Sequence, residues 1–356
     1  MTGLTYSRMV KKDRILIYFM VLIFIFLSSC KKLPDESIVW ELPLYYKEHL
    51  EERICEILHA NEQMVDCVSF FWITDIHWEP DLNARRSPAM IRYLASRIGI
   101  HQVLNGGDTG NSFAICSNAI SRLRDAIGSD RVYSVNGNHE INDASRYEKP
   151  YERVHSALRG HCQDIVYGDK NKSYFYFDDA VSKVRYIGLS TYGLFINNQY
   201  ENAYTEEQLQ WLTEEALDVE GGWTIIIFTH SLYYESLPSK ELVVQSPFFV
   251  DAIDQYQGKG KIACVLMGHS HVDRIHFGKS GIPYIISQCD RTEPYRGDIN
   301  VERIRGTISE NHFEVILLDK AKQEIHLYAI GSDARDGVDH EAGEKVSVRI
   351  VKYGEQ

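Results

Sequence analysis

The sequence lacks the features that mark several classes of protein. Its seven cysteines include no Cys-x-x-Cys pair, which disfavours a thiolate zinc site. It contains no internal repeat and no low-complexity segment. Positively charged residues are outnumbered, because the chain has 38 Lys and Arg but 50 Asp and Glu. Its formal net charge is therefore −12. Such an acidic surface disfavours a nucleic-acid polymer as a partner, since that affinity comes from neutralising phosphates.

The sequence does contain enough apolar residues for a folded core. Hydrophobic residues make up 44% and aromatic residues 12% of the 356 residues. This composition excludes a disordered, collagen-like or coiled-coil chain as the main interpretation. No protein partner is evident from the sequence.

The first thirty residues have the pattern of an export signal. Basic residues precede an uncharged apolar run over residues 15–27, and Ser28, Ser29 and Cys30 follow it. Thirteen apolar residues fall short of the roughly 20 that cross a bilayer, so we favour a cleaved signal over a transmembrane anchor. The segment from Leu27 to Cys30 resembles a bacterial lipobox. That resemblance implies a lipid on Cys30 and a membrane-anchored protein of the bacterial cell envelope, on the periplasmic or outer-membrane side.

Downstream of residue 66, strand-like and helix-like segments alternate, which predicts an α/β layered domain. The predicted helices cover residues 88–98, 113–127 and 206–217, with Thr205 as the N-cap of the third. A hairpin is expected over residues 312–330. The other predicted strands cover residues 68–74, 102–105, 131–136, 174–178, 184–191, 224–229, 261–267 and 284–288.

Polar side chains follow five of these strands directly, where the carboxyl ends of strands form the crevice of an open α/β sheet. Each motif alone has an ordinary explanation: His230 could be a core histidine, and the segment from Gly137 to Glu140 could cap a helix. Their joint occurrence favours one site. The side chains in question are Asp75, His77, Asp108, Asn138, His139, His230, His269 and His271.

Seven groups of these kinds, carboxylate, imidazole or carboxamide, satisfy the needs of two divalent cations, and such a set suits Zn, Mn or Fe. Two divalent metal ions held together can clamp the attacking and leaving oxygens of a phosphoryl displacement. The sequence therefore predicts two divalent metal ions as cofactors and a small phosphorylated substrate.

The motifs resemble those of the calcineurin-like metallophosphoesterase family: Asp-x-His, Gly-Asp, Gly-Asn-His-Glu, a lone His and Gly-His-x-His, over residues 75–271. The resemblance implies two packed mixed β-sheets flanked by helices, a four-layer α/β/β/α sandwich, with the 312–330 hairpin at the far end of the second sheet. It assigns one metal to Asp75, His77, Asp108 and His271. The other metal would be held by Asp108, Asn138, His230 and His269, with Asp108 bridging.

The resemblance also gives His139 and Asp108 catalytic roles, with His139 beside the metals rather than bound to them. His139 would protonate the leaving alkoxide or stabilise the phosphoryl oxygens. Glu140 could orient His139 or begin a helix, and we favour the second role. Asn111 departs from the family, which commonly has Asp there. Further expected substrate contacts are Trp78, Asn111, Tyr192, Tyr234 and Arg291.

The function predicted by the resemblance is hydrolysis of a phosphate ester, with a metal-bridging hydroxide as the nucleophile. The ligands do not separate a monoesterase from a phosphodiesterase or nucleotide hydrolase acting on an envelope substrate. A binding lipoprotein without catalysis is the alternative from another class. The predicted organisation is a lipoprotein signal peptide (1–29), a lipidated N-terminus, tether and lead-in helix (30–66), a metallophosphoesterase catalytic domain (67–335) and a C-terminal tail (336–356).

Overall fold

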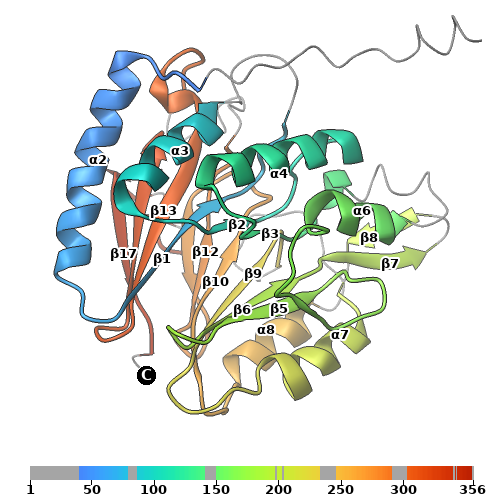
Figure 1. Ribbon diagram of the computed structural model, residues 1–356. Helices are drawn as coiled ribbons and strands as arrows, with labels where there is room; N and C mark the ends of the chain where they lie inside the picture. The colour runs from blue at the N-terminus through green and yellow to red at the C-terminus, as the bar shows by residue number, and fades with distance from the viewer. Residues whose placement is uncertain are drawn as a thin grey trace, which may run out of the picture. The chain divides into compact units, whose positions relative to one another are not determined.

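The computed structural model describes residues 40–78, 86–140, 150–196, 199–202, 204–232, 246–290, 303–339, 341 and 343–354 (Figure 1). The predicted signal and the lipobox Cys30 lie outside the described residues. None of the described helices combines the length and the apolar character that a membrane span requires. The cysteines from Cys55 to Cys289 are all free thiols, and Cys264 is buried as its apolar strand predicts.

Two mixed β-sheets form the centre of the fold. The first sheet has the strand order β17-β14-β13-β1-β2-β3, with parallel pairing of β1 to β2 and β2 to β3 and antiparallel pairing elsewhere. Its strands are β1 (Cys67–Ile73), β2 (Val103–Asn105), β3 (Val132–Ser134), β13 (His312–Asp319), β14 (Glu324–Gly331) and β17 (Val348–Lys352).

The second sheet has the order β11-β12-β10-β9-β6-β5-β4, and its parallel centre runs from β12 to β6. Its strands are β4 (Val166–Tyr167), β5 (Phe175–Asp179), β6 (Val184–Leu189), β9 (Thr224–Thr229), β10 (Lys261–Met267), β11 (Arg274–Phe277) and β12 (Pro283–Ile286). Two small ribbons complete the described strands: β7 (Tyr192–Ile196) with β8 (Gln199–Asn202), and β15 (Ala334–Arg335) with β16 (Lys345–Val346).

Strand β1 shows why the two sheets pack face to face. Its side chains alternate between two cores, as the two-residue period of a strand requires. Phe70 and Trp72 enter the core between the sheets, whereas Phe71 and Ile73 enter the core under the helices of the first sheet. All four are buried, which explains the uninterrupted apolar run in the sequence.

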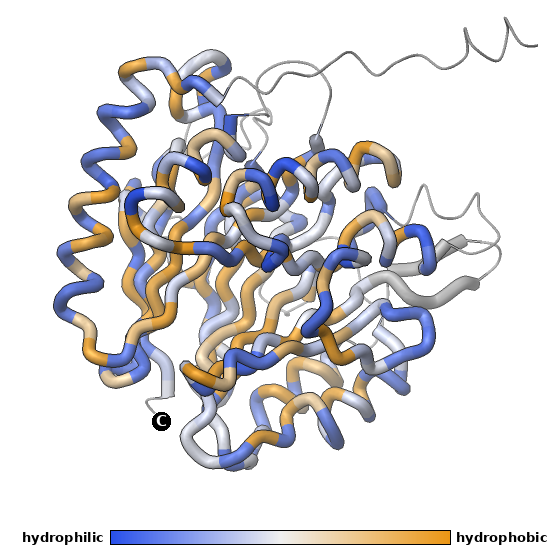
Figure 2. Tube along the Cα trace, in the orientation of Figure 1, coloured by the Kyte–Doolittle hydropathy of each residue, from blue (hydrophilic) through white to orange (hydrophobic). Residues whose placement is uncertain are grey.

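Helices cover the outer faces of both sheets (Figure 1). The first sheet is covered by α2 (Leu44–Glu62), α3 (Arg86–Ile98), α4 (Phe113–Ile127) and α6 (Pro150–Leu158). The second sheet is covered by α7 (Glu206–Trp211), its π-helical continuation η1 (Leu212–Ala216) and α8 (Ser246–Asp254). The short helix η3 (Ile308–Glu310) precedes β13. Figure 2 shows the central strands as hydrophobic along most of their length and α2 as alternating in hydropathy. The predicted four-layer α/β/β/α arrangement is confirmed.

Two expectations about the C-terminal part differ from the structure. The hairpin of β13 and β14 belongs to the first sheet, where β13 pairs antiparallel with β1, and not to the far end of the second sheet. The predicted tail over residues 336–356 contains Val348–Lys352, which pairs with β14 as the edge strand β17. Its short, polar-alternating sequence gave little sign of a strand, because only one of its faces is buried.

Candidate metal centre

The predicted site residues lie where strands of both sheets end. Strands β1, β2 and β3 of the first sheet and β9 and β10 of the second each run directly into one of the polar motifs. The crevice is therefore shared by two packed sheets, instead of lying along the edge of one open sheet as the sequence suggested.

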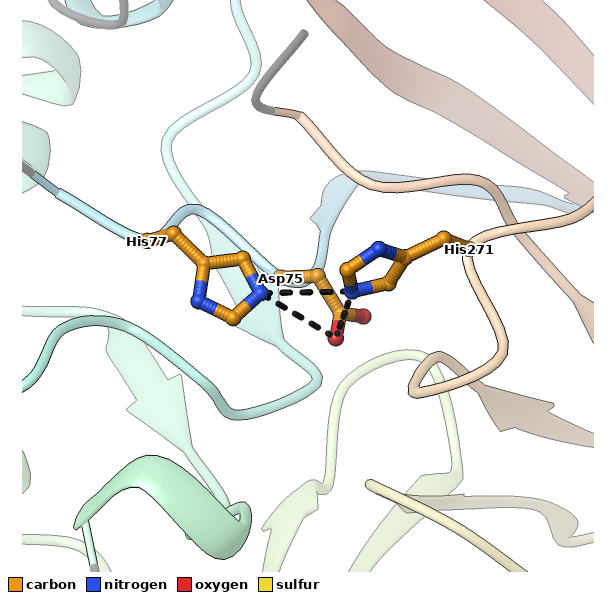
Figure 3. A group of neighbouring side chains, drawn as sticks. All are labelled: Asp75, His77 and His271. Atoms are coloured by element: carbon orange, nitrogen blue, oxygen red, sulfur yellow. Dashed lines mark hydrogen bonds and ion pairs between the residues drawn. The ribbon is translucent and has the colours of Figure 1, made fainter. Parts of the chain in front are cut away.

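Asp75, His77 and His271 form the first of two ligand clusters (Figure 3). The Nε2 atoms of His77 and His271 are 3.2 Å apart, and His271 Nε2 lies 3.1 Å from Asp75 Oδ1. His77 Nε2 is 3.9 Å from the same carboxylate oxygen. All three residues are buried, so their polar atoms converge on one small volume.

The second cluster contains Asp108, Asn138, His230 and His269. His230 Nε2 lies 3.3 Å from Asp108 Oδ2 and 3.2 Å from both Asn138 Oδ1 and His269 Nδ1. Asp108 Oδ2 also lies 3.9 Å from His77 Nε2 in the first cluster. Asp108 thus stands between the two clusters, where the resemblance places the bridging carboxylate.

Short contacts between the motif loops hold these side chains in place. His269 N donates to Asp75 Oδ2 at 2.9 Å, and His139 N donates to Asp108 Oδ1 at 2.9 Å. His230 Nδ1 donates to the carbonyl oxygen of Gly106 at 2.8 Å, which directs its Nε2 towards Asp108. These contacts join the β1 loop to the β10 loop, and the β2 loop to the β3 and β9 loops.

Backbone conformation sets the candidate ligands apart from the rest of the chain. Nine non-glycine residues in the described part have a positive φ, and five of them are Asp75, His77, Asp108, His269 and His271, with φ between 43° and 66°. An L-residue in this left-handed region costs of the order of 1 kcal/mol. Strain concentrated on five neighbouring polar residues is typical of a functional site.

Glycines let these loops approach one another. A Cβ on Gly137 would lie 2.2 Å from Asp108 Oδ1, and one on Gly268 would lie 2.3 Å from Asp75 Oδ2. Both distances are shorter than atoms tolerate, so the glycine that starts each motif makes room for a carboxylate of another strand.

Carboxylates and imidazoles in the clusters shift each other's pKa values. Burial alone would raise the pKa of Asp75 and Asp108, but the nearby imidazoles, His230 foremost, lower both on balance. Although burial acts the other way, these carboxylates raise the pKa of His230 to about 9, and Asp75 raises that of His271 to about 11. Burial lowers the pKa of His77. Because an imidazole binds metal without its proton, metal binding here releases protons.

The chemistry of the donor set fits divalent metal ions. Carboxylate oxygens, imidazole nitrogens and one carboxamide oxygen converge in the two clusters. Two imidazole nitrogens that face each other at 3.2 Å can share a cation between their lone pairs. Asp75 and Asp108 are both buried, so a cation bound between them would balance carboxylate charge that water does not solvate.

His139 lies at the open side of the clusters. Its side chain is 38% exposed, its Nε2 is 3.7 Å from Asp108 Oδ2, and its ring is 4.6 Å from that of His77. The Nδ1 of His139 donates to Asn111 Oδ1. His139 is thus adjacent to both clusters and accessible from solvent.

Glu140 has a role that the sequence interpretation missed. Its carboxylate accepts hydrogen bonds from the backbone N–H groups of Asp108, Thr109 and Gly137, at 3.1, 2.6 and 2.8 Å. Burial, and then the charge of Asp108, raise the pKa of Glu140. Glu140 therefore ties the β2 and β3 loops together. The only sequence signal was its place in the Gly-Asn-His-Glu motif.

The structure gives positions for only some of the expected substrate contacts. Trp78 is 2% exposed and packs in the core under the helices of the first sheet, so it is not a rim residue. Asn111 is exposed beside His139. Tyr192 begins β7, but its side chain is outside the described part, as are Tyr234 and Arg291.

A third group of potential ligands lies deeper, at Asp273, His312 and Glu314. Arg349 of β17 forms an ion pair with Glu314, and its Nη2 is 3.7 Å from Asp273 Oδ1. Burial opposes ionisation of Glu314, yet Arg349 lowers the pKa of Glu314 on balance. A guanidinium already neutralises these carboxylates, so this group is an ion-pair network and not a cation site.

The fold and the convergent clusters define a metal-dependent phosphoesterase. The sequence matches the calcineurin-like phosphoesterase family over residues 68–273, more than half of its length, and the chain belongs to that family. It therefore hydrolyses phosphoesters at a metal centre.

Comparison with solved structures shows that the fold of this chain is similar to that of a known phosphatase. No curated protein matches the sequence. The chain resembles a dimetal phosphatase from Danio rerio, with 14% identity and a TM-score of 0.56 over 80% of this chain and 99% of that one. Weaker likenesses are to a 5'-nucleotidase from Candida albicans (18% identity, TM-score 0.42, 62% and 46% covered) and to the phosphopantetheinyl hydrolase of Mycobacterium tuberculosis (11%, 0.38, 62% and 89%).

Proposed function

We propose that the chain hydrolyses a small phosphate ester with two divalent metal ions, Mn, Fe or Zn. Asp75, His77, Asp108 and His271 would hold one ion. The other would be held by Asp108, Asn138, His230 and His269. The observation that carries this proposal is the position of Asp108, whose Oδ2 lies 3.9 Å from His77 Nε2 in one cluster and 3.3 Å from His230 Nε2 in the other.

Metal ions held there would lower the pKa of water to supply a hydroxide nucleophile and would neutralise charge on the phosphoryl group. His139 is the side chain placed to act on the substrate itself. It is partly exposed and 3.7 Å from Asp108 Oδ2, so its Nε2 can donate a proton to the leaving oxygen or a hydrogen bond to a phosphoryl oxygen. Asn111 accepts from Nδ1 and fixes the direction of the ring.

The proposed substrate is compact, because the two metal ions would make one crevice locally cationic in a protein whose net charge is −12. The proposed metal ligands are compatible with both monoesters and diesters. The preference between these two substrate classes therefore depends on the shape of the protein surface around the site. A binding protein without turnover would be expected to lack some of the seven proposed ligands, and the sequence of this chain contains all seven.

Replacement of Asp108 by Ala tests the function. Metal content by mass spectrometry and turnover of p-nitrophenyl phosphate and of bis(p-nitrophenyl) phosphate should both fall in this variant, and His139→Ala should lose turnover by about 100-fold or more with metal retained. Full turnover by metal-depleted Asp108→Ala would contradict the proposal. The ratio of the two wild-type activities assigns the ester class.

The proposal includes attachment to the cell envelope through a lipid on Cys30. Its support is the lipobox-like segment from Leu27 to Cys30 behind an apolar run. Labelling with a radioactive fatty acid in a bacterial host should mark the wild type but not Cys30→Ser, and the wild type should fractionate with membranes. Equal labelling of both proteins would contradict the anchor.

A further inference from the structure

A cavity of about 330 Å³ lies at the same edge of the second sheet as the candidate ligands. Its walls come from α6, the turn between β4 and β5, the end of β6 and the start of α7. Its size is at the lower end of the range for small-molecule pockets. A monosaccharide-sized group therefore suits it better than an oligomer.

The strand register places this cavity next to the metal centre. Leu189 at the end of β6 pairs with Thr229 at the end of β9. The next residues along these two strands are Ser190, which lines the cavity, and the candidate ligand His230. Since paired strands lie about 4.8 Å apart, the inner wall of the cavity is one strand spacing from a metal ligand.

A side-chain hydrogen bond makes the same connection on the other side of the crevice. Ser190 Oγ donates to Asn136 Oδ1 at 3.1 Å, and both residues are buried. Asn136 precedes the candidate ligand Asn138 by two residues. One buried hydrogen bond thus joins the cavity wall at Ser190 to the loop that carries Asn138.

The chemistry of the walls selects among alcohols. No aliphatic side chain is among the lining residues in the described part of the chain. Asp169 is occupied by Ser173, whose N and Oγ donate to it at 2.7 Å. Lys170 and Glu207, both exposed at the rim, add one cation and one carboxylate. The walls can donate and accept hydrogen bonds, and their apolar surface comes from aromatic rings and the carbon stems of polar side chains.

Two tyrosines supply the flat surfaces of the cavity. Tyr151 and Tyr174 both line it, and Tyr174 is held against Trp211 with ring centroids 4.8 Å apart. Such rings combine an apolar body with a polar tip, which matches a sugar ring that alternates C–H faces with hydroxyls.

We infer that this cavity receives the alcohol part of the substrate and that this alcohol is polyhydroxylated, like a sugar or a polyol. The inference rests on the proposed function, because it assumes that the phosphoryl group sits at the metal centre. Hydrolysis adds one water across the ester: the phosphorus keeps the water oxygen, and the alcohol leaves with the ester oxygen and a proton.

Saturation-transfer NMR on the purified full chain, with free glucose, adenosine and 1-hexanol as probes, tests the cavity without turnover. Glucose should receive saturation from the wild type, and the signal should fall about ten-fold in Lys170→Ala/Glu207→Ala, as loss of one good hydrogen bond predicts. The matched control Lys172→Ala/Glu206→Ala removes the same charges from the same turn and helix, outside the cavity lining, and should bind like the wild type. No glucose signal, an equal loss in both double variants, or preference for adenosine or hexanol would overturn the inference.

Kinetics distinguish failure of the cavity from failure of the function. In Lys170→Ala/Glu207→Ala the KM for glucose 6-phosphate should rise about ten-fold while kcat/KM for p-nitrophenyl phosphate stays within about three-fold, because only the alcohol contacts are lost. Equal losses on both esters would overturn the inference. A wild type that hydrolyses neither ester refutes the proposed function, and the glucose-binding result then stands on its own.

Discussion

His139 donates a hydrogen bond from Nδ1 to Oδ1 of Asn111, and this contact joins the β3 loop to the residue that precedes the N-cap of α4. The other ring nitrogen of His139 faces Asp108 at 3.7 Å. Asn111 stands where the resemblance leads one to expect Asp, so a neutral acceptor orients His139 in this chain.

Asn111→Leu should lower kcat by about ten-fold or more and change KM little, because the ring loses its fixed direction while the ligands stay in place. Asn111→Asp keeps an acceptor at Oδ1 and should retain kcat within about three-fold. Steady-state kinetics with p-nitrophenyl phosphate measure both variants. Equal kcat in Asn111→Leu and the wild type would show that the contact does not position His139.

Gly137→Ala should remove metal as well as activity. The new Cβ would lie 2.2 Å from Asp108 Oδ1, so the carboxylate between the two clusters must move. We expect a loss of about 1–3 kcal/mol in the free energy of unfolding and clear loss of bound metal, by urea denaturation and mass spectrometry. Gly221→Ala is the matched control, because its Cβ meets no atom within 4 Å. Wild-type metal content in Gly137→Ala would contradict this reading of the loop.

Arg349→Met should be among the most destabilising single substitutions in β17. It leaves Glu314 and Asp273 buried without their guanidinium, which typically costs about 3–5 kcal/mol. The double variant Arg349→Met/Glu314→Leu should regain part of that loss, since one unpaired charge disappears. Lys352→Met, on the exposed side of the same strand, should change stability by less than about 0.5 kcal/mol. Urea denaturation measures the free energy of unfolding of the three variants and of Glu314→Leu. If the loss in the double variant equals the sum of the losses in Arg349→Met and Glu314→Leu, the ion pair between Arg349 and Glu314 does not stabilise the protein.

Asp290 predicts a pH dependence of stability. Burial raises its pKa to about 6, although Ser87 Oγ donates to it at 2.5 Å and Arg303, the N–H of His312 and Asn311 also lower it. The folded state therefore holds this proton more tightly than the unfolded state. The resulting stabilisation is complete below about pH 4 and is lost as the pH rises through about 6, by roughly 3 kcal/mol in total.

Asp290→Asn keeps the acceptor oxygen and removes the titration. Burial already lowers the pKa of the neighbouring His312, so His312 stays neutral above pH 6.5 in both proteins. Between pH 5 and 7.5 the free energy of unfolding should fall by about 1–2 kcal/mol more in the wild type than in Asp290→Asn. Parallel pH profiles of the two proteins would show that this carboxyl group does not contribute.

Much of the fold could be predicted because its central strands are unambiguous. Residues 224–229 and 261–267 coincide with β9 and β10 as predicted, since buried parallel strands leave long apolar runs in a sequence. The edge strands Arg274–Phe277 and Val348–Lys352 were not predicted, because both have mixed sequences. In β11 the buried residues include Arg274 and His276, and in β17 only one face is buried. Strand β17 is only five residues long, so its sequence pattern gives no sign that Arg349 is buried. From the pattern alone this arginine would be placed on the surface.

The candidate site could be found from the sequence because each ligand follows a strand end within a short motif. What the sequence could not show is which side chains support the ligands. Glu140 acts on backbone groups of Asp108 and Thr109, more than thirty residues earlier, and such a contact leaves no local pattern. The sequence likewise could not show that Ser190 lies beside His230, because this depends on how β6 pairs with β9.

The position of Arg349 has a consequence for synthesis of the protein. During translation every candidate ligand, up to His271, has left the ribosome well before Val348–Lys352 follows. Until that strand is added, Glu314 and Asp273 lack the guanidinium that lets them be buried. The nascent chain can therefore carry a full set of ligands yet not close the polar layer beneath them. Burial of this ion-pair network therefore waits for Val348–Lys352, and we expect chains truncated before this strand to be more sensitive to proteolysis.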